Sequence, residues 1–259
     1  MSVAAEQTIH VASEDGVATI TLDHPPLNVL TTAMLKELDT ALHDVAARPE
    51  IRLIVLRGAG RVFSAGVDVG EHIGEALRPM LDAFLAMSLR LAECPVPTLA
   101  VVHGAALGGG GELAALCDLA IAADDAKIGT PEISLGVVPP VAAAIYPGLV
   151  GSQRARALVL TGEPIRGGEA AAWGLVWKSV PADALDAEVA TVAERFRSLS
   201  AASLRLAKRT FRSAANEGTA ADAIRAADGE QREWLPRLHD ADEGLRSFVE
   251  KRPPRWEHR

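Results

Sequence analysis

Apolar residues gather in short runs through the first half of the chain, separated by polar or glycine-containing segments. Two runs, Ile9–Ser13 and Val17–Leu22, flank Asp15-Gly16, a dipeptide typical of a tight hairpin turn. The runs at 51–56 and 98–102 are almost wholly apolar, as strands buried on both faces of a parallel sheet are. Shorter apolar runs predict two further strands, at 119–123 and 126–129.

Stretches with helical spacing of apolar residues lie between these strands, over 31–47 and 75–92, and a short helix is expected at 113–116. Strands that alternate with helices in this way predict βαβ units with parallel pairing. From Gly151 the pattern becomes almost purely helical, with helices expected at 151–161, 168–172, 183–198, 201–214, 218–235 and 240–251. We therefore expect an α/β core over residues 1–195 and a helical C-terminal region over residues 196–259.

Composition narrows the class of protein. Of 259 residues, 49% are hydrophobic, enough for a sizeable core, and 34 acidic residues outnumber 26 basic ones. Because no basic stripe interleaved with aromatic residues is present, nucleic acid is not an expected partner. No signal-like N-terminus and no apolar run of about 18 residues occurs, so we expect no membrane partner. Two cysteines make no disulfide framework, and we expect a cytoplasmic protein.

Four consecutive glycines, Gly108 to Gly111, are followed directly by Glu112 and lie between two apolar runs. Glycine allows a backbone to approach another group closely, and a helix that begins after such a turn presents unpaired N–H groups. This pattern predicts backbone amides that hold a developing negative charge beside a carboxylate. Taken alone, Glu112 is also typical of an acidic residue that favours the start of a helix.

Two further turns follow predicted strands and add to this chemistry, Phe63–Asp68 and Gly129–Glu132. Amides from two loops that converge on one oxygen, with two carboxylates nearby, suit a reaction that passes through an enolate. By itself Glu132 is equally typical of the first turn of a helix after Pro131. No Lys-Ser or Lys-Thr follows the glycines, which excludes a P-loop, and the spacing is wrong for a dinucleotide fold. The histidines form no metal-ligand pattern, so we expect no metal.

The motifs taken together resemble the crotonase (enoyl-CoA hydratase/isomerase) superfamily over nearly the whole chain. The resemblance implies an α/β fold with the superfamily's ββα spiral core and a helical C-terminal trimerisation region. The segments that carry it are Pro25–Leu30, Phe63–Asp68, Gly108–Glu112, Pro131-Glu132 with Leu135-Gly136, Leu160–Gly162, Ala172–Val176 and Glu243–Arg252.

The resemblance also implies roles for individual residues. The N–H groups of Val67 and Gly109 would form the oxyanion hole for the thioester oxygen, and Glu112 and Glu132, 20 positions apart, would together move the protons. Both glutamates are present, as in hydratases, whereas relatives with other reactions commonly lack one. The residues expected to contact the substrate are Ala65, Gly66, Asp68, Gly108, Gly110 and Pro139. The reaction needs no cofactor, since coenzyme A is part of the substrate.

The segment Val137–Pro147 departs from the superfamily, whose members usually have a glycine-rich stretch ending in Gln-Arg-Leu there. With Ser203–Arg205 and the ending at 250–257, this segment resembles the branch that hydrates cyclic dienoyl-CoA esters in aromatic-acid degradation. The resemblance thus favours an enoyl-CoA hydratase that is assembled as a homotrimer or homohexamer. The substrate that this branch implies is cyclohexa-1,5-diene-1-carbonyl-CoA. A double-bond isomerase and a non-catalytic acyl-CoA-binding protein remain as alternatives.

Overall fold

Two sheets organise the described part of the chain, residues 7–215, 233 and 237–259 of a computed structural model. The larger sheet has six strands in the order β1-β2-β3-β4-β6-β9, and the smaller has three in the order β5-β7-β8. The strands are β1 (Ile9–Glu14), β2 (Val17–Leu22), β3 (Leu53–Gly58), β4 (Thr98–Val102), β5 (Ala105–Leu107), β6 (Leu119–Ala123), β7 (Lys127–Gly129), β8 (Ile165–Arg166) and β9 (Lys178–Val180).

The larger sheet is parallel apart from its first pair. Strands β1 and β2 form the predicted antiparallel hairpin, whose turn uses positive φ angles at Asp15 and Gly16. From β2 onward the neighbours β3, β4, β6 and β9 pair in parallel. All of β4 and nearly all of β3 are buried, which explains their unbroken apolar sequence. The predicted parallel α/β core is confirmed.

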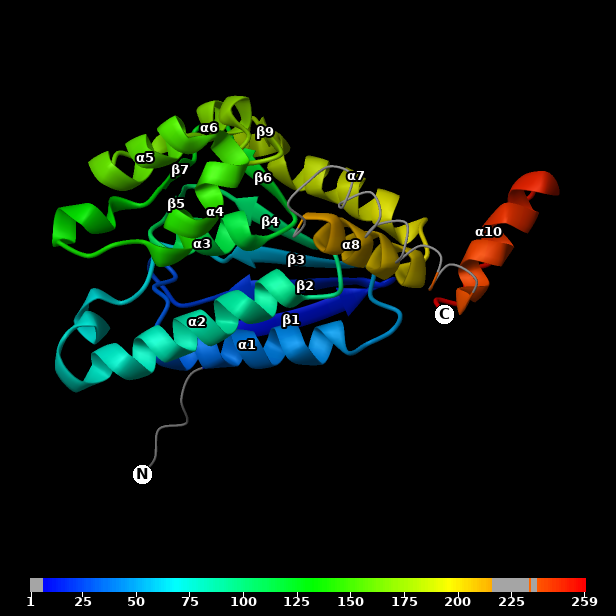
Figure 1. Cartoon of the computed structure of the whole chain (residues 1–259), viewed down its shortest axis with the longest axis horizontal. Helices are drawn as coiled ribbons and strands as arrows, with labels where there is room; N and C mark the ends of the chain where they lie inside the picture. The colour runs from blue at the N-terminus through cyan, green and yellow to red at the C-terminus, as the bar shows by residue number, and fades with distance from the viewer. Residues whose placement is uncertain (1–6, 216–232, 234–236) are drawn as a thin grey trace.

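Helices cover both faces of the larger sheet. Figure 1 shows α1 (Thr32–Ala46) and α2 (Leu77–Glu93) side by side below the strands, with α7 (Leu185–Arg197) above them. The other helices are α3 (Gly109–Leu116), α4 (Pro140–Val150), α5 (Ser152–Thr161), α6 (Gly167–Trp173), α8 (Ala201–Ala215) and α10 (His239–Val249), with short 3₁₀ turns η1 (Val69–His72), η2 (Gly74–Ala76), η3 (Pro131–Leu135) and η4 (Ala182–Ala184). Among the described helices, none has the length and apolar character needed to cross a membrane.

The smaller sheet brings two distant turns together. Strands β5 and β7 pair in parallel, with Leu107 opposite Gly129, so both strands end at the same edge. The N–H of Gly108 then donates to the carbonyl of Gly129 at 2.9 Å. Because α3 follows β5 and η3 follows β7, this pairing places the turns that carry Glu112 and Glu132 beside each other.

Several expected elements differ from those observed. Two short strands, β8 and β9, interrupt the region after Gly151 that was expected to be helical. Helix α3 was expected at 113–116, but it already begins at Gly109 and so includes three of the four glycines. Gly108, which precedes the helix, has a positive φ of 53°. Helix α4 was not expected, and the predicted helix at 218–235 lies mostly outside the described residues. The predicted boundary after residue 195 falls inside α7, and the division into two regions stays a prediction.

Candidate active site

A cavity of about 350 Å³ lies where the turn after β3, the start of α3 and η3 meet. Its polar side chains are Glu112, Glu132 and His72. Most other lining side chains are apolar, and they come mainly from η1, α2 and the segment after η3. Among the residues singled out in the sequence, seven line this cavity: Ala65, Gly66, Val67, Gly108, Gly109, Glu112 and Glu132.

Asn28 and Ser64 fix the turn that carries Val67. The Nδ2 group of Asn28 donates to the carbonyls of Val62 and Phe63 at 2.8 and 3.2 Å. The Ser64 hydroxyl donates to the Asn28 carbonyl and accepts from the N–H of Gly66. These buried bonds hold the turn in one conformation.

Leu30 then pairs with the backbone on either side of Val67. Its N–H donates to the carbonyl of Gly66, and its carbonyl accepts from the N–H of Asp68. In the described part of the chain, no group accepts a hydrogen bond from the N–H of Val67. This amide is therefore available to a ligand in the cavity.

The start of α3 supplies a second available amide close to the first. Gly109 is the first residue of α3, so its N–H has no partner inside the helix, and no other described group accepts from it. A Cβ atom placed on Gly109 would lie 2.6 Å from Cγ2 of Val67, and one placed on Gly66 would lie 3.5 Å from the Gly109 nitrogen. Only glycine permits this approach, which brings the two unpaired amides to one end of the cavity.

Glu112 is 2% exposed and lies against the first turn of α4. The N–H of Ala142 donates to its Oε1 at 2.8 Å. Burial, with a smaller contribution from the nearby Glu132, raises the pKa of Glu112 to about 7, although the N–H groups of Ala142 and Val141 oppose the rise. A carboxyl group with such a pKa exchanges protons readily near neutral pH.

Glu132 occupies the first turn of η3, after Pro131. A Cβ atom on Gly108 would lie 2.8 Å from Glu132 Oε1, so any side chain at position 108 would displace the carboxylate. Its Oε2 is buried and has no hydrogen-bond partner among the described residues. Burial raises the pKa of Glu132, opposed by its own N–H and by His72. Two carboxyl groups with raised pKa values therefore face one cavity.

The three remaining residues predicted for the site, Asp68, Gly110 and Pro139, do not line the cavity. Asp68 caps η1 by accepting from the N–H of Gly70 at 2.7 Å. Gly110 faces the Val67 turn, because a Cβ there would lie 2.7 Å from the Ser64 carbonyl oxygen. Pro139 is buried, and its two neighbours, Val138 and Pro140, line the cavity instead.

Comparison with known proteins places this geometry in a family. The model of the enoyl-CoA hydratase/isomerase family matches residues 12–259. A probable enoyl-CoA hydratase of Mycobacterium bovis is 36% identical over 260 residues, covering 98% of this chain and 99% of that protein. The chain belongs to the enoyl-CoA hydratase/isomerase family. The membership in the crotonase superfamily inferred from the sequence is thus confirmed.

Other members of the family are similar in sequence or in structure. Cyclohexa-1,5-dienecarbonyl-CoA hydratase of Thauera aromatica is 37% identical over 243 residues, with 92% of each chain covered. The crystal structure of an enoyl-CoA hydratase from Bacillus anthracis matches with a TM-score of 0.91 at 30% identity, covering 98% of this chain and 100% of that one. These matches confirm the predicted fold class.

Of the three polar side chains that line the cavity, His72 lies outside the motifs seen in the sequence. Its Nδ1 donates to the carbonyl of Asp68 at 2.9 Å, which fixes the ring beside the cavity. The preceding residue, Glu71, instead accepts from the N–H and hydroxyl of Thr32 and ties η1 to the start of α1. Of these two neighbours, only His72 lines the cavity.

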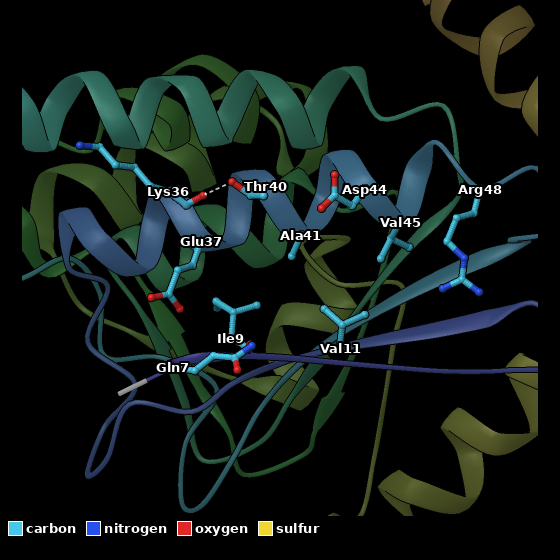
Figure 2. A pocket seen from close by; sticks show the side chains of 10 residues that line it. All are labelled: Gln7, Ile9, Val11, Lys36, Glu37, Thr40, Ala41, Asp44, Val45 and Arg48. Carbon is cyan, nitrogen blue, oxygen red and sulfur yellow. Dashed lines mark hydrogen bonds between the residues drawn. The ribbon is translucent and has the colours of Figure 1, made fainter. Parts of the chain in front are cut away.

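A larger hollow, of about 590 Å³, lies between β1 and α1 and has a different character (Figure 2). Its Glu37 carboxylate accepts from the N–H and hydroxyl of Thr8, and Arg48 is paired with Glu50. These charged groups join the start of β1 and the end of α1 to their surroundings. The hollow is therefore a gap between the packed elements β1 and α1, and we do not assign it a role in the reaction.

Proposed function

We propose that the chain is an enoyl-CoA hydratase, which adds water across the α,β double bond of an enoyl-CoA thioester. The observation that carries this proposal is a pair of carboxyl groups, the buried Glu112 and the half-buried Glu132, in a cavity that also receives two unpaired amides. The names of the family and of several relatives support the same reaction. The chemistry draws on no metal or redox cofactor.

In this reaction the thioester oxygen accepts hydrogen bonds from the N–H groups of Val67 and Gly109. These bonds polarise the conjugated system and stabilise the enolate, and loss of one such donor typically costs about 3 kcal/mol. The oxygen of water bonds to the β-carbon while Glu112 and Glu132 together accept one of its protons. The same pair delivers a proton to the α-carbon, so its total protonation is unchanged. We assign the two carboxyl groups jointly, because close groups titrate as a pair.

We further propose that the acyl group is a cyclic dienoyl group, as in cyclohexa-1,5-diene-1-carbonyl-CoA, a compound of aromatic-acid degradation. The similarity to the Thauera aromatica enzyme supports this choice. So does the cavity wall, where apolar side chains such as Phe84, Leu135 and Val138 suit a hydrocarbon ring.

A panel of linear, branched, cyclic and aryl enoyl-CoA thioesters tests both parts of the proposal. Hydration of the cyclic dienoyl thioester with the highest kcat/KM is the expected result. Fast hydration of crotonyl-CoA with no turnover of the cyclic ester would contradict the cyclic substrate. Double-bond migration without water addition would favour an isomerase, and no turnover of any thioester would favour an acyl-CoA-binding protein.

We also propose that the enzyme assembles as a homotrimer or a homohexamer and works in the cytoplasm. Exposed apolar side chains, among them Phe211 on α8 at 76% exposure, support an interface between subunits. Both cysteines are buried free thiols, which suits a reducing compartment. Sedimentation equilibrium tests the assembly, and a mass of one subunit, 27.2 kDa, would contradict it.

A further inference from the structure

One buried polar group near the active site has no partner. Tyr146, the chain's only tyrosine, is 0% exposed. Its hydroxyl finds no hydrogen-bond partner in the part of the chain that the structure describes. Leaving a buried hydroxyl unpaired destabilises the folded protein, and phenylalanine would avoid that cost. The presence of tyrosine rather than phenylalanine at this position therefore needs a physical explanation.

Helix α4 places this hydroxyl near Glu112. Ala142, whose N–H holds Glu112 Oε1, and Tyr146 are four residues apart, so they lie on the same helix face. Side chains in a helix lean toward its N-terminus, which is the end that contacts Glu112. A Cβ atom on Gly111, the residue before Glu112, would lie 3.4 Å from the Tyr146 hydroxyl oxygen. The phenol thus lies against the backbone that carries the carboxylate.

The charges around Tyr146 suit a hydrogen-bond donor. Burial raises its pKa, and the carboxylates of Glu112 and Glu132 raise it further, so the phenol keeps its proton at working pH. Glu132 of η3 and Tyr146 of α4 are the titratable groups that face Glu112, and His72 of η1 faces Glu132. Tyr146 does not line the cavity itself. It is therefore placed to act through Glu112 rather than on the substrate.

We propose that Tyr146 is a positioning residue for Glu112, whose hydroxyl donates a hydrogen bond to the ionised carboxylate. This inference rests on the proposed hydratase function. The bond stabilises the charged form of Glu112, lowers the pH at which the site becomes active, and holds the carboxylate toward the water. It also gives the buried hydroxyl the partner that it otherwise lacks.

Tyr146→Phe removes the hydroxyl and leaves the ring. We expect the acid limb of the kcat/KM profile to move up by about one pH unit, because a donor to the ionised form is lost. We expect kcat at pH 7 to fall about tenfold with little change in KM. Ser88→Ala is the matched control, because it removes another buried, unpaired hydroxyl from α2, outside the cavity lining. A Tyr146→Phe profile that overlays the wild type, as the control should, would overturn the proposal.

A second measurement does not depend on turnover. The melting temperature followed from pH 4 to 9 reports the titration of Glu112 in the folded protein. In Tyr146→Phe the pH range of this change should move upward relative to the wild type, and in Ser88→Ala it should not. If no thioester is hydrated by the wild type, the hydratase proposal fails, and this shift still decides the role of Tyr146. Identical pH dependence in Tyr146→Phe and wild type would overturn that role.

Discussion

The N–H of Ala142 donates to Oε1 of Glu112 at 2.8 Å, which joins the start of α4 to a carboxyl group carried by α3. Pro140 is the first residue of α4, where a missing N–H breaks no helix hydrogen bond. The N–H groups of the next two residues, Val141 and Ala142, favour the ionised form of Glu112. The segment between 137 and 147 therefore does more than line the cavity. It sets the environment in which Glu112 gains and loses its proton.

Glu112→Gln should stabilise the folded protein at alkaline pH. Burial raises the folded-state pKa of Glu112 from 4.5 to about 7, so the native protein holds this proton more tightly than the unfolded chain does. Stability is thus lost as pH rises from about 4.5 to about 7, and the loss is complete above that range. Removing the charge should recover on the order of 3 kcal/mol at pH 8 and little at pH 4.

Urea unfolding at pH 4, 6 and 8 measures this effect. Glu163→Gln, at an exposed position after α5, is the control and should leave the free energy of unfolding unchanged at each pH. A Glu112→Gln variant that is no more stable than wild type at pH 8 would mean that burial of the charged carboxylate does not destabilise the folded protein.

Gly108→Ala should disturb the site as well as the fold. A Cβ at position 108 meets Glu132 Oε1 at 2.8 Å, and its φ of 53° strains any other residue by about 1–2 kcal/mol. Gly60→Ala is the matched control, because it has a φ of 69° but no atom within 4 Å of the new methyl group. Both variants should lose similar stability, whereas only Gly108→Ala should lose hydration rate, by at least about tenfold. Equal hydration rates in the two variants would mean that the position of the Glu132 carboxylate does not affect catalysis.

Asn28→Ala should loosen the turn that presents Val67. The Nδ2 group of Asn28 donates to the carbonyls of Ala59, Val62 and Phe63, and these acceptors would lose their donor. We expect a loss of about 2–4 kcal/mol in the free energy of unfolding and a lower kcat in the protein that remains folded. Thr40→Ala, which removes a hydroxyl that donates to the Lys36 carbonyl on the surface of α1, should change neither quantity. A stable, fully active Asn28→Ala protein would contradict this role.

Local chemistry made most of the fold predictable from the sequence. The Asp15-Gly16 turn, the wholly apolar β4 and the periodic apolar face of α1 each follow from a pattern within a few residues. The glycine run and Glu112 were also recognisable, since only a close backbone approach requires four glycines in sequence. The place of Gly109, Gly110 and Gly111 inside α3 was not recognisable, because a glycine run is a poor helix former on propensity alone.

Features that depend on distant contacts were not predictable. Strands β8 and β9 have two and three residues, too few for a periodic pattern, and exist because β7 and β6 offer partners. Helix α4 has a readable signal, Pro140 before an apolar stretch, but its contact with Glu112 is tertiary. Pro139 was expected at the substrate, but its neighbours Val138 and Pro140 line the cavity and Pro139 does not.

The most direct test of the account replaces each carboxyl group by an amide, as Glu112→Gln and Glu132→Gln. Hydration by purified protein is followed through loss of enoyl-thioester absorbance, and binding of the saturated thioester is measured in parallel. The account predicts that each variant loses about 10²–10⁴-fold in kcat while it retains thioester binding. Unchanged turnover in both variants would contradict the proposal that Glu112 and Glu132 together move the protons of water.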